Sequence, residues 1–250
     1  MINLANRVEY SIVIPAFNEA KIIENTINQV HDYFLSLGEN FEIIFSDDGS
    51  KDNSLEIVKQ LKEKNEEKYR NIQIITSSVN KGRGNALTEA FKSANGDIIA
   101  YIDADLAIDI TLFNEMKKYI SEGYDIVIGS KHLKESEVAY SKTRRFLSRS
   151  YSYLASILFK EINIKDYQCG FKCFNREIID KVLPNIQSKG WSWDTEILIK
   201  SHLQGFKIKE IPAKVNFVAG RKSTVKVLKD SYSMGTYLIK LFFETKGGIQ

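Results

Sequence analysis

Residues 97–105 read DIIAYIDAD, an apolar run followed by two aspartates, Asp103 and Asp105. A run of this length, rich in β-branched residues, predicts a buried strand. The two acids then stand at the carboxyl end of that strand. Further apolar runs lie on both sides of this stretch in the chain, and helical patterns separate them.

The first half of the chain alternates predicted strands with predicted helices. Strands are expected at residues 10–16, 41–47, 71–77, 97–105 and 124–130, and helices at 20–37, 52–61, 85–94 and 110–120. Apolar strands that alternate with amphipathic helices predict an α/β fold, with a mostly parallel central sheet and helices on both faces.

The pattern changes after Ser130. Residues 131–160 predict a long basic and aromatic helix, residues 161–220 are more irregular with short strands, and residues 224–243 predict a last amphipathic helix. A length of 250 residues suits one domain. We therefore expect a single domain over 1–250, in which about 8–130 bind a nucleotide and about 131–250 bind the acceptor.

Composition and charge exclude several classes of protein. The formal net charge of +3 is too small to argue for nucleic acid as a partner. No apolar run approaches the roughly 18 residues of a membrane-spanning helix, and the first ten residues lack the apolar core of a secretory signal. The protein is therefore expected in the cytoplasm.

Cysteine and histidine offer no metal site. The two cysteines, Cys169 and Cys173, are interpreted as reduced, partly buried thiols, because a structural zinc ion needs four ligands. The three histidines are far apart in the sequence.

Acidic residues follow three of the predicted strands. They are Glu19 after the first, Asp47 and Asp48 at the end of the second, and Asp103 and Asp105 after the fourth. Ligands of open parallel sheets bind at the carboxyl ends of the strands. Each acid alone could be a turn residue or a helix cap, but five together would repel one another unless a cation or ligand donors lie among them. The Asp-Ala-Asp sequence suits a hard divalent ion, Mg²⁺ or Mn²⁺, that also binds phosphate oxygens.

A glycine-rich turn opens the third predicted helix. Its residues, Lys81, Gly82, Arg83 and Gly84, could bind an anion at the helix N-terminus, or could be only a turn into a surface helix. The segment lacks the pattern of a P-loop, which argues against ATP hydrolysis.

Several segments resemble those of a known family. SIVIPAFNEA, FSDDGSKDNS, NKGRGNALTEAF and YIDADLA resemble blocks of the family 2 glycosyltransferases, which have the GT-A fold. QCGFKCF, WSWDTEIL, KEIPA and RKSTVKVLKDS are similar to segments of the dolichyl-phosphate glucosyl- and mannosyltransferases. The resemblance covers about residues 10–235 and implies an inverting enzyme that uses a nucleotide sugar.

The resemblance also implies roles for individual residues. Pro15, Phe17 and Glu19 would border the nucleotide, Asp48 with Asp47 would hydrogen-bond the base, and Lys81, Gly82 and Lys131 would add to the donor site. Asp103 would lie near the ribose and the metal, and Asp105 would bind the metal.

Two positions depart from the mannosyltransferase pattern. Ala107 replaces a glutamine that would contact the metal, and Lys131 replaces an arginine, which keeps the charge but loses the bidentate geometry. Both departures favour a UDP-sugar as donor, with GDP-mannose still possible.

In the second half, the resemblance points to an acceptor site. It implies that an acid among Asp194 and Glu196 faces the acceptor, and that Arg221 and Lys226 belong to a basic loop that closes over the diphosphate. The alternative for the basic loop is a solvated run of charge. Arg144–Phe159 is expected either to lie at a membrane surface or to face the core.

Together these features predict transfer of one sugar to a polyprenyl phosphate at the cytoplasmic face of a membrane. One alternative is transfer to a sugar hydroxyl in the synthesis of a cell-surface polysaccharide, which requires a general base. The other is a regulatory protein that binds nucleotide sugars without turnover.

Overall fold

The computed structural model describes residues 7–138, 142–216 and 227–247, with side chains outside 142–148, 227–228 and 247. A seven-stranded sheet forms its centre, in the order β3-β2-β1-β4-β7-β5-β8. Its strands are β1 (Tyr10–Ala16), β2 (Phe41–Asp47), β3 (Ile72–Thr76), β4 (Ile98–Ile102), β5 (Ile126–Ser130), β7 (Phe171–Asn175) and β8 (Ile208–Pro212). All of them run parallel except β7, which is antiparallel to both β4 and β5.

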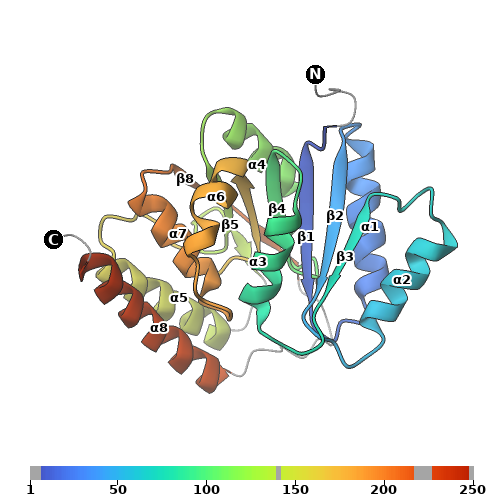
Figure 1. Cartoon of the computed structure of the whole chain (residues 1–250). Helices are drawn as coiled ribbons and strands as arrows, with labels where there is room; N and C mark the ends of the chain where they lie inside the picture. The colour runs from blue at the N-terminus through green and yellow to red at the C-terminus, as the bar shows by residue number, and fades with distance from the viewer. Residues whose placement is uncertain (1–6, 139–141, 217–226, 248–250) are drawn as a thin grey trace.

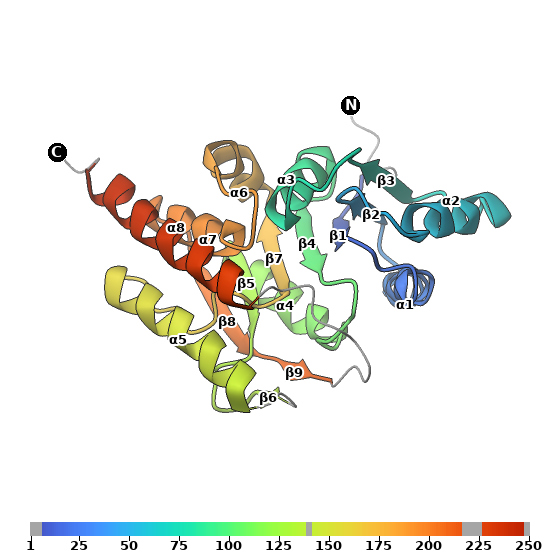
Figure 2. The same cartoon turned by 90° about the horizontal axis from the view of Figure 1, so that it is seen from below.

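Helices cover both faces of the sheet, as the sequence pattern predicts (Figure 1). In Figure 2, α3, α6 and α7 lie on one face, and α1 and α4 on the other. The helices are α1 (Ile23–Ser36), α2 (Ser54–Lys64), α3 (Arg83–Ser93), α4 (Leu112–Ser121), α5 (Lys142–Leu158), α6 (Arg176–Lys181), α7 (Trp193–Leu203) and α8 (Val227–Gly247), with a 3₁₀ turn at Leu183–Asn185.

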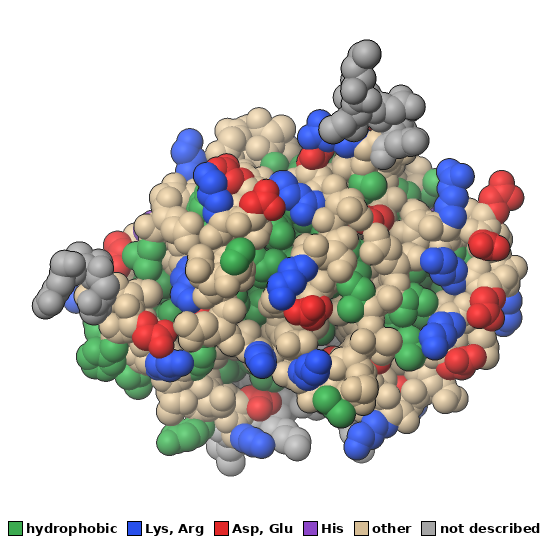
Figure 3. All heavy atoms as spheres, viewed as in Figure 1, with side chains coloured by type: hydrophobic (Ala, Val, Ile, Leu, Met, Phe, Trp, Pro, Cys, Tyr) green, Lys and Arg blue, Asp and Glu red, His purple; other side chains and the backbone are tan. Residues whose placement is uncertain are grey.

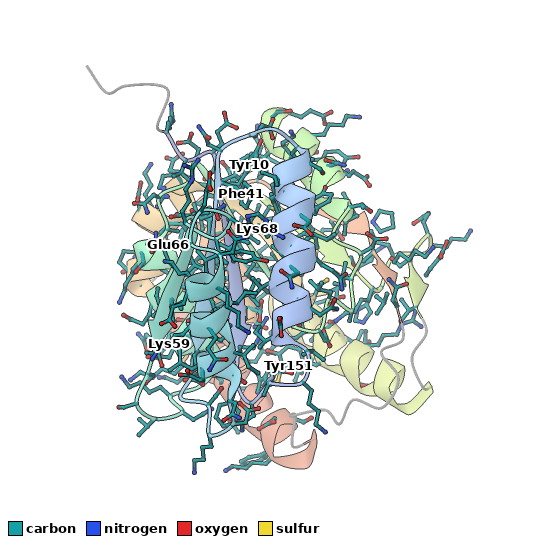
Figure 4. The ribbon with its side chains drawn as sticks, turned by 90° about the vertical axis from the view of Figure 1, so that its right-hand side faces the viewer. Tyr10, Phe41, Lys59, Glu66, Lys68 and Tyr151 are labelled. Carbon is teal, nitrogen blue, oxygen red and sulfur yellow. The ribbon has the colours of Figure 1, made fainter. Side chains whose placement is uncertain are left out.

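Burial patterns explain why these segments form these elements. All seven residues of β1 are buried, as expected of a central strand with helices on both faces. The α1 helix buries one stripe of side chains, which includes Val30 and Phe34, against the sheet. Tyr10 and Phe41 are register partners on β1 and β2, and both rings contact Phe34. Figure 4 shows Tyr10 and Phe41 near one end of α1, whereas Tyr151 lies at the opposite end of the molecule.

The expected helix over 131–160 is wrong in its first part. Glu137–Val138 form strand β6, which pairs with β9 (Lys214–Val215) in a small second sheet, and α5 begins only at Lys142. The backbone of this segment bonds elsewhere: the amide of Lys131, for example, donates to the carboxylate of Asp166. These long-range partners replace the local hydrogen bonds of a helix.

The α5 and α8 helices pack against each other beyond the β8 edge of the sheet, as Figures 1 and 2 both show. The rings of Phe159 and Phe242 meet edge to face between the two segments. Over the described residues, none of the helices combines the length and hydropathy that crossing a bilayer requires.

Candidate active site

The predicted strand-end residues meet at one edge of the sheet. Because β2, β1 and β4 are neighbours and run parallel, their carboxyl ends lie side by side, at the bottom of Figure 1 and facing the reader in Figure 2. Pro15 is buried in β1, and Phe17 and Glu19 follow it in partly buried positions. The amide of Glu19 donates to the hydroxyl of Ser54, which ties the first loop to α2.

Asp47 and Asp48 are both buried, and both hold neighbouring loops. The Asp47 carboxylate accepts hydrogen bonds from the amide of Ser50 and the hydroxyl of Thr76. Asp48 accepts from the amides of Lys81 and Gly82, each at 2.8 Å. Burial raises the pKa of Asp48 despite these donors. A carboxylate has about four acceptor sites, so both acids retain capacity for a ligand donor.

These contacts change the interpretation of the glycine-rich turn. The anion bound at the start of α3 is the protein's own Asp48, and the Lys81 side chain is exposed. Gly82 has a φ of +105°, and a Cβ there would lie 2.3 Å from the carbonyl oxygen of Lys189. The glycine therefore lets the turn pack against the loop that leads into α7.

The Asp-Ala-Asp segment forms a tight turn after β4. Asp103 donates its amide to the carbonyl of Gly170, and its side chain remains 42% exposed. The carboxylate of Asp105 accepts from the amide of Ala107. Between them in the turn, Leu106 adopts a left-handed φ of +47°, a strained conformation that often marks functional sites.

This turn can bind a hard cation only if further ligands come from the substrate or from water. Two carboxylates two residues apart, each partly exposed, supply the oxygen ligands that Mg²⁺ or Mn²⁺ prefers. Among the described residues, no group of three or more His, Cys, Asp or Glu side chains could complete a metal site. The residues therefore fit a metal whose remaining ligands come from the substrate or water.

Arg83 connects this turn to the start of α7. Its Nη2 lies 2.8 Å from Oδ1 of Asp103, and its Nη1 lies 2.7 Å from Oδ2 of Asp194. Only 13% of the Arg83 side chain is exposed. The guanidinium therefore binds two acids from distant parts of the sequence.

Asp194 is buried and binds two basic side chains and a tyrosine hydroxyl. Its Oδ1 accepts from the buried ammonium of Lys172 at 2.7 Å and from the hydroxyl of Tyr101, and its Oδ2 accepts from Arg83. Burial alone would raise the pKa of this carboxyl, but the charges of Lys172 and Arg83 outweigh burial and lower it. Asp194 is thus held in its ionised form.

Glu196 lies in the same first turn of α7 but has different neighbours. Its carboxylate accepts from the amides of Gln187 and Ser188 and from the hydroxyl of Tyr237 on α8, and it forms an ion pair with Lys200. The residue is fully buried. This geometry fits an anchor for α8 better than a group that faces a substrate.

The QCGFK segment, Gln168–Lys172, lies against both Asp103 and Asp194. A Cβ on Gly170 would lie 1.9 Å from Oδ2 of Asp103, so only glycine leaves room for that carboxylate. Two residues on, Lys172 binds Asp194. Lys131 donates to the carbonyl of Gln168 and so lies against the same segment.

Sequence reasoning missed Lys172 and Tyr101 as site residues. A charged residue inside the apolar strand Phe171–Asn175 was the available signal for Lys172, because a buried lysine needs a partner. Tyr101 gave no signal, since tyrosine is common in strands. Arg221 and Lys226 lie outside the described residues, and so do the side chains of Arg144 and Arg145.

Comparison with known sequences gives related glycosyltransferases. The profile of "Glycosyl transferase family 2" matches residues 11–183. The chain is 32% identical over 95% of its length to glycosyltransferase AglD of Haloferax volcanii, of which it spans 37%. It is 31% identical over 91% of its length to a dolichyl-phosphate beta-glucosyltransferase of Saccharomyces cerevisiae, of which it spans 76%. It is 32% identical over 94% of its length to dolichyl-phosphate beta-glucosyltransferase ALG5A of Trichomonas vaginalis, of which it spans 73%.

Comparison with solved structures supports the same fold. Glucosyl-3-phosphoglycerate synthase from Mycobacterium tuberculosis, in complex with UDP, superposes with a TM-score of 0.69 at 20% identity, over 97% of this chain and 81% of that one. A second structure of that enzyme holds Mn²⁺, UDP and phosphoglyceric acid, with a TM-score of 0.68 at 20% identity, over 96% of this chain and 78% of that one. The expected GT-A architecture is confirmed.

Proposed function

Because this chain belongs to glycosyl transferase family 2 and is a glycosyltransferase, we propose that it moves one sugar from a nucleotide diphosphate donor to a polyprenyl phosphate. The similarity to dolichyl-phosphate beta-glucosyltransferases supports this acceptor class. The UDP in the neighbouring fold, together with Ala107 and Lys131, favours a UDP-sugar over GDP-mannose as donor.

The bonding of Asp194 is the observation that carries this proposal. A sugar hydroxyl needs a base to accept its proton, and a base that is bound by Lys172, Arg83 and Tyr101 is a weak one. A phosphate monoester has a second pKa of about 6 and is already an anion at neutral pH. The site can therefore act by positioning a nucleophile that needs no proton removed.

The transfer itself is a displacement at the anomeric carbon. An oxygen of the acceptor phosphate forms a bond to that carbon from the face opposite the nucleotide, the bond to the diphosphate breaks, and the configuration inverts. Negative charge moves from the acceptor to the leaving diphosphate. Asp103 and Asp105 would hold Mg²⁺ or Mn²⁺, which stabilises the charge on the diphosphate when bound. Arg221 and Lys226 would add positive charge on the same side.

Donor contacts are assigned along the same sheet edge. Pro15, Phe17 and Glu19 would border the nucleotide, and Asp47 and Asp48 would present their remaining acceptor sites to the base. The turn at Lys81 and Gly82, together with Lys131, would line the donor site. We assign Glu196 a structural role as the anchor of α8, because the amides, Tyr237 and Lys200 already surround its carboxylate.

We also propose that the paired helices α5 and α8 contact the membrane surface that contains the acceptor, on its cytoplasmic face. On α5, Ala155 is buried, whereas Tyr153 is 69% exposed. On α8, Tyr232 and Phe243 are 77% and 68% exposed. An exposed lysine lies about one helical turn from each of them, Lys229 from Tyr232 and Lys246 from Phe243. The helix face consists of Lys229, Tyr232, Thr236, Ile239, Phe243 and Lys246. Figure 3 shows apolar and basic side chains together at the lower left, over these helices.

Liposome sedimentation tests this membrane contact. Wild-type protein should pellet with anionic vesicles and be released as salt rises, because basic residues add an electrostatic attraction. Joint substitution Ile239→Ser and Phe243→Ser should weaken pelleting, as should Arg144→Glu, Arg145→Glu and Arg149→Glu together. Leu35→Ser is the matched control, since Leu35 is 59% exposed on α1. Equal pelleting of all variants would contradict the assignment.

A choice of acceptors tests the reaction. We would offer a short-chain polyprenyl phosphate and the matching free alcohol, each with UDP-glucose and Mn²⁺, and then with other nucleotide sugars. Transfer to the phosphate alone is expected, with a rate that follows ionisation of the phosphate near its second pKa. Asp194→Asn should lower that rate through misplacement, by less than the about 10²–10⁴-fold that loss of a general base costs. Transfer to the alcohol at a comparable rate would overturn the acceptor class.

A further inference from the structure

The salt-bridge network between β4 and α7 links the two sides of the site through one residue. Arg83 contacts Asp103, which follows β4, and Asp194, which begins α7, with two different nitrogen atoms. These acids are 20 and 111 residues away from it in sequence. The two contacts are of similar length, so the guanidinium holds both acids at once.

The surroundings fix the guanidinium in place. Its central carbon lies 5.0 Å from the centre of the Tyr101 ring and 5.6 Å from that of Trp191. Such cation–π contacts restrict the plane of the group as well as its position. Arg83 is also the first residue of α3, directly after the turn that binds Asp48. The side chain is therefore held at its base by the turn and at its tip by two acids and two rings.

Charges in the network balance. Arg83 and Lys172 face Asp103 and Asp194, two positive groups against two negative ones. Of the four, Asp103 has the most exposed side chain, at 42%, whereas the Lys172 side chain is fully buried. Removing one member leaves an unpaired charge in a buried place, which is costly. The network is thus a rigid unit whose exposed end is the first acid of the Asp-Ala-Asp turn.

We propose that Arg83 is a positioning residue that couples the donor side of the site to the acceptor side. It fixes the Asp103 carboxylate through Oδ1, which orients that acid for the donor, and its second contact makes this orientation depend on Asp194 and hence on the start of α7. The proposal rests on the donor site assigned above. A lysine would not replace Arg83, because one ammonium lacks the planar fork that reaches two carboxylates in different directions.

Positioning and simple electrostatics predict opposite effects for Asp194→Asn. Removal of a negative charge from the network makes the site more positive, which alone would strengthen binding of an anionic nucleotide. If Asp194 acts through Arg83 on Asp103, the same substitution weakens nucleotide binding, although Asp194 makes no contact with Asp103 among the described interactions. The sign of the change therefore separates the two explanations.

A double-mutant cycle on nucleotide affinity tests the coupling. UDP binding in the presence of Mn²⁺ would be measured by calorimetry for wild type, Arg83→Gln, Asp194→Asn and the double variant, after thermal unfolding has shown that each is folded. Asp194→Asn should weaken binding about fivefold in the wild-type background and by less than about twofold in the Arg83→Gln background, as expected of coupled neighbours. Arg83→Lys replaces Arg83→Gln in the cycle if the latter does not fold, and the same pattern is expected.

Controls separate this inference from the proposed donor. Arg7→Gln breaks an exposed ion pair with Asp97 and should leave UDP affinity unchanged. If wild type binds GDP and not UDP, the donor assignment fails, and the same cycle with GDP still tests the coupling. Independent effects of the two substitutions, or tighter binding by Asp194→Asn, would overturn the role of Arg83.

Discussion

The two aspartates after β4 differ in what holds them, although only one residue separates them. Asp103 is fixed from outside its turn, by Arg83 and by the close approach of Gly170. The Asp105 carboxylate accepts a hydrogen bond inside the turn, from the amide of Ala107. The orientation of Asp103 therefore depends on contacts far away in the sequence, whereas one contact of Asp105 is local.

We expect Asp105→Asn to lower turnover of UDP-glucose by about 10²–10³-fold, the usual cost of removing one stabilising group at a leaving anion. Asp109→Asn is a matched control, because the Asp109 carboxylate also accepts from the amide two residues on, that of Thr111. Initial rates with Mn²⁺, and for wild type with excess EDTA, are the measurement. Full activity in excess EDTA would contradict the assignment of a metal to this site.

Gly170→Ala should weaken UDP binding, because its new Cβ would lie 1.9 Å from Asp103 Oδ2 and one of the two residues must move. Forced overpacking of this kind typically costs about 1–3 kcal/mol of stability. Gly235→Ala in α8 is the control, since a Cβ there meets nothing within 4 Å. Calorimetry with UDP and denaturant unfolding measure the two effects. Unchanged affinity would mean that Asp103 does not bind the donor.

Among the elements, α7 lies in a region for which the sequence pattern predicted only irregular structure and short strands. Its first turn places Asp194 toward β4 and β7, and Glu196 toward the loop at Gln187 and toward α8. Two acids two residues apart on a helix point in different directions, so each serves a different part of the molecule. The helix is buried on nearly all sides, which is why it shows almost no apolar stripe.

Sequence patterns predicted the elements better than their pairing. The segment FEIIFSD coincides with β2, Phe41–Asp47. A short continuous apolar run between polar turns is typical of a buried strand. The insertion of β7 between β4 and β5 had no local signal, since strand pairing depends on contacts far apart in sequence. The strand-end acids were likewise expected at one edge, but the cations that bind Asp103 and Asp194 were not, because Arg83 and Lys172 come from other elements.

Glu196→Ala should destabilise the protein by about 3–5 kcal/mol, because it removes the buried carboxylate that balances the charge of Lys200 and accepts from two amides. Among the described residues, Lys200 would keep only its hydrogen bond to the carbonyl of Asn185. Activity should fall only as far as the folded fraction falls. The control is Glu244→Ala, whose exposed pair with Lys240 on α8 is expected to contribute about 0–1 kcal/mol. Denaturant unfolding and activity at low temperature separate the two effects. A stable but inactive Glu196→Ala protein would instead make Glu196 catalytic.

At the scale of the whole molecule, one sheet contains strands from both halves of the chain. The β5 strand lies between β7 and β8, both of which come from the second half. The division into a nucleotide-binding half and an acceptor-binding half remains a prediction about ligands. As a fold, the two halves share one core, and both cysteines are buried in it.

Thiol reactivity should therefore report on opening of this core. Burial raises the pKa of Cys169 to about 12 and also raises that of Cys173, so both thiols stay protonated and unreactive in the folded protein at pH 8. We expect a thiol reagent to modify native protein at least about a thousandfold more slowly than denatured protein. Rapid labelling of Cys173 under native conditions would mean that β7 opens locally, and rapid labelling of Cys169 that the segment before β7 does. Mass spectrometry after digestion would identify which thiol has reacted.

The position of β7 also affects how the chain folds while it is being synthesised. When β4 leaves the ribosome, its neighbour β1 is present, but its other neighbour is still 68 residues away, between Ile102 and Phe171. At about 5–20 residues per second, this gap lasts roughly 3 to 14 seconds. Throughout that interval β4 has an unpaired edge, which is a template for wrong pairing with other chains. The edge of β4 therefore stays open to such pairing until β7, its second neighbour in the sheet, has been synthesised.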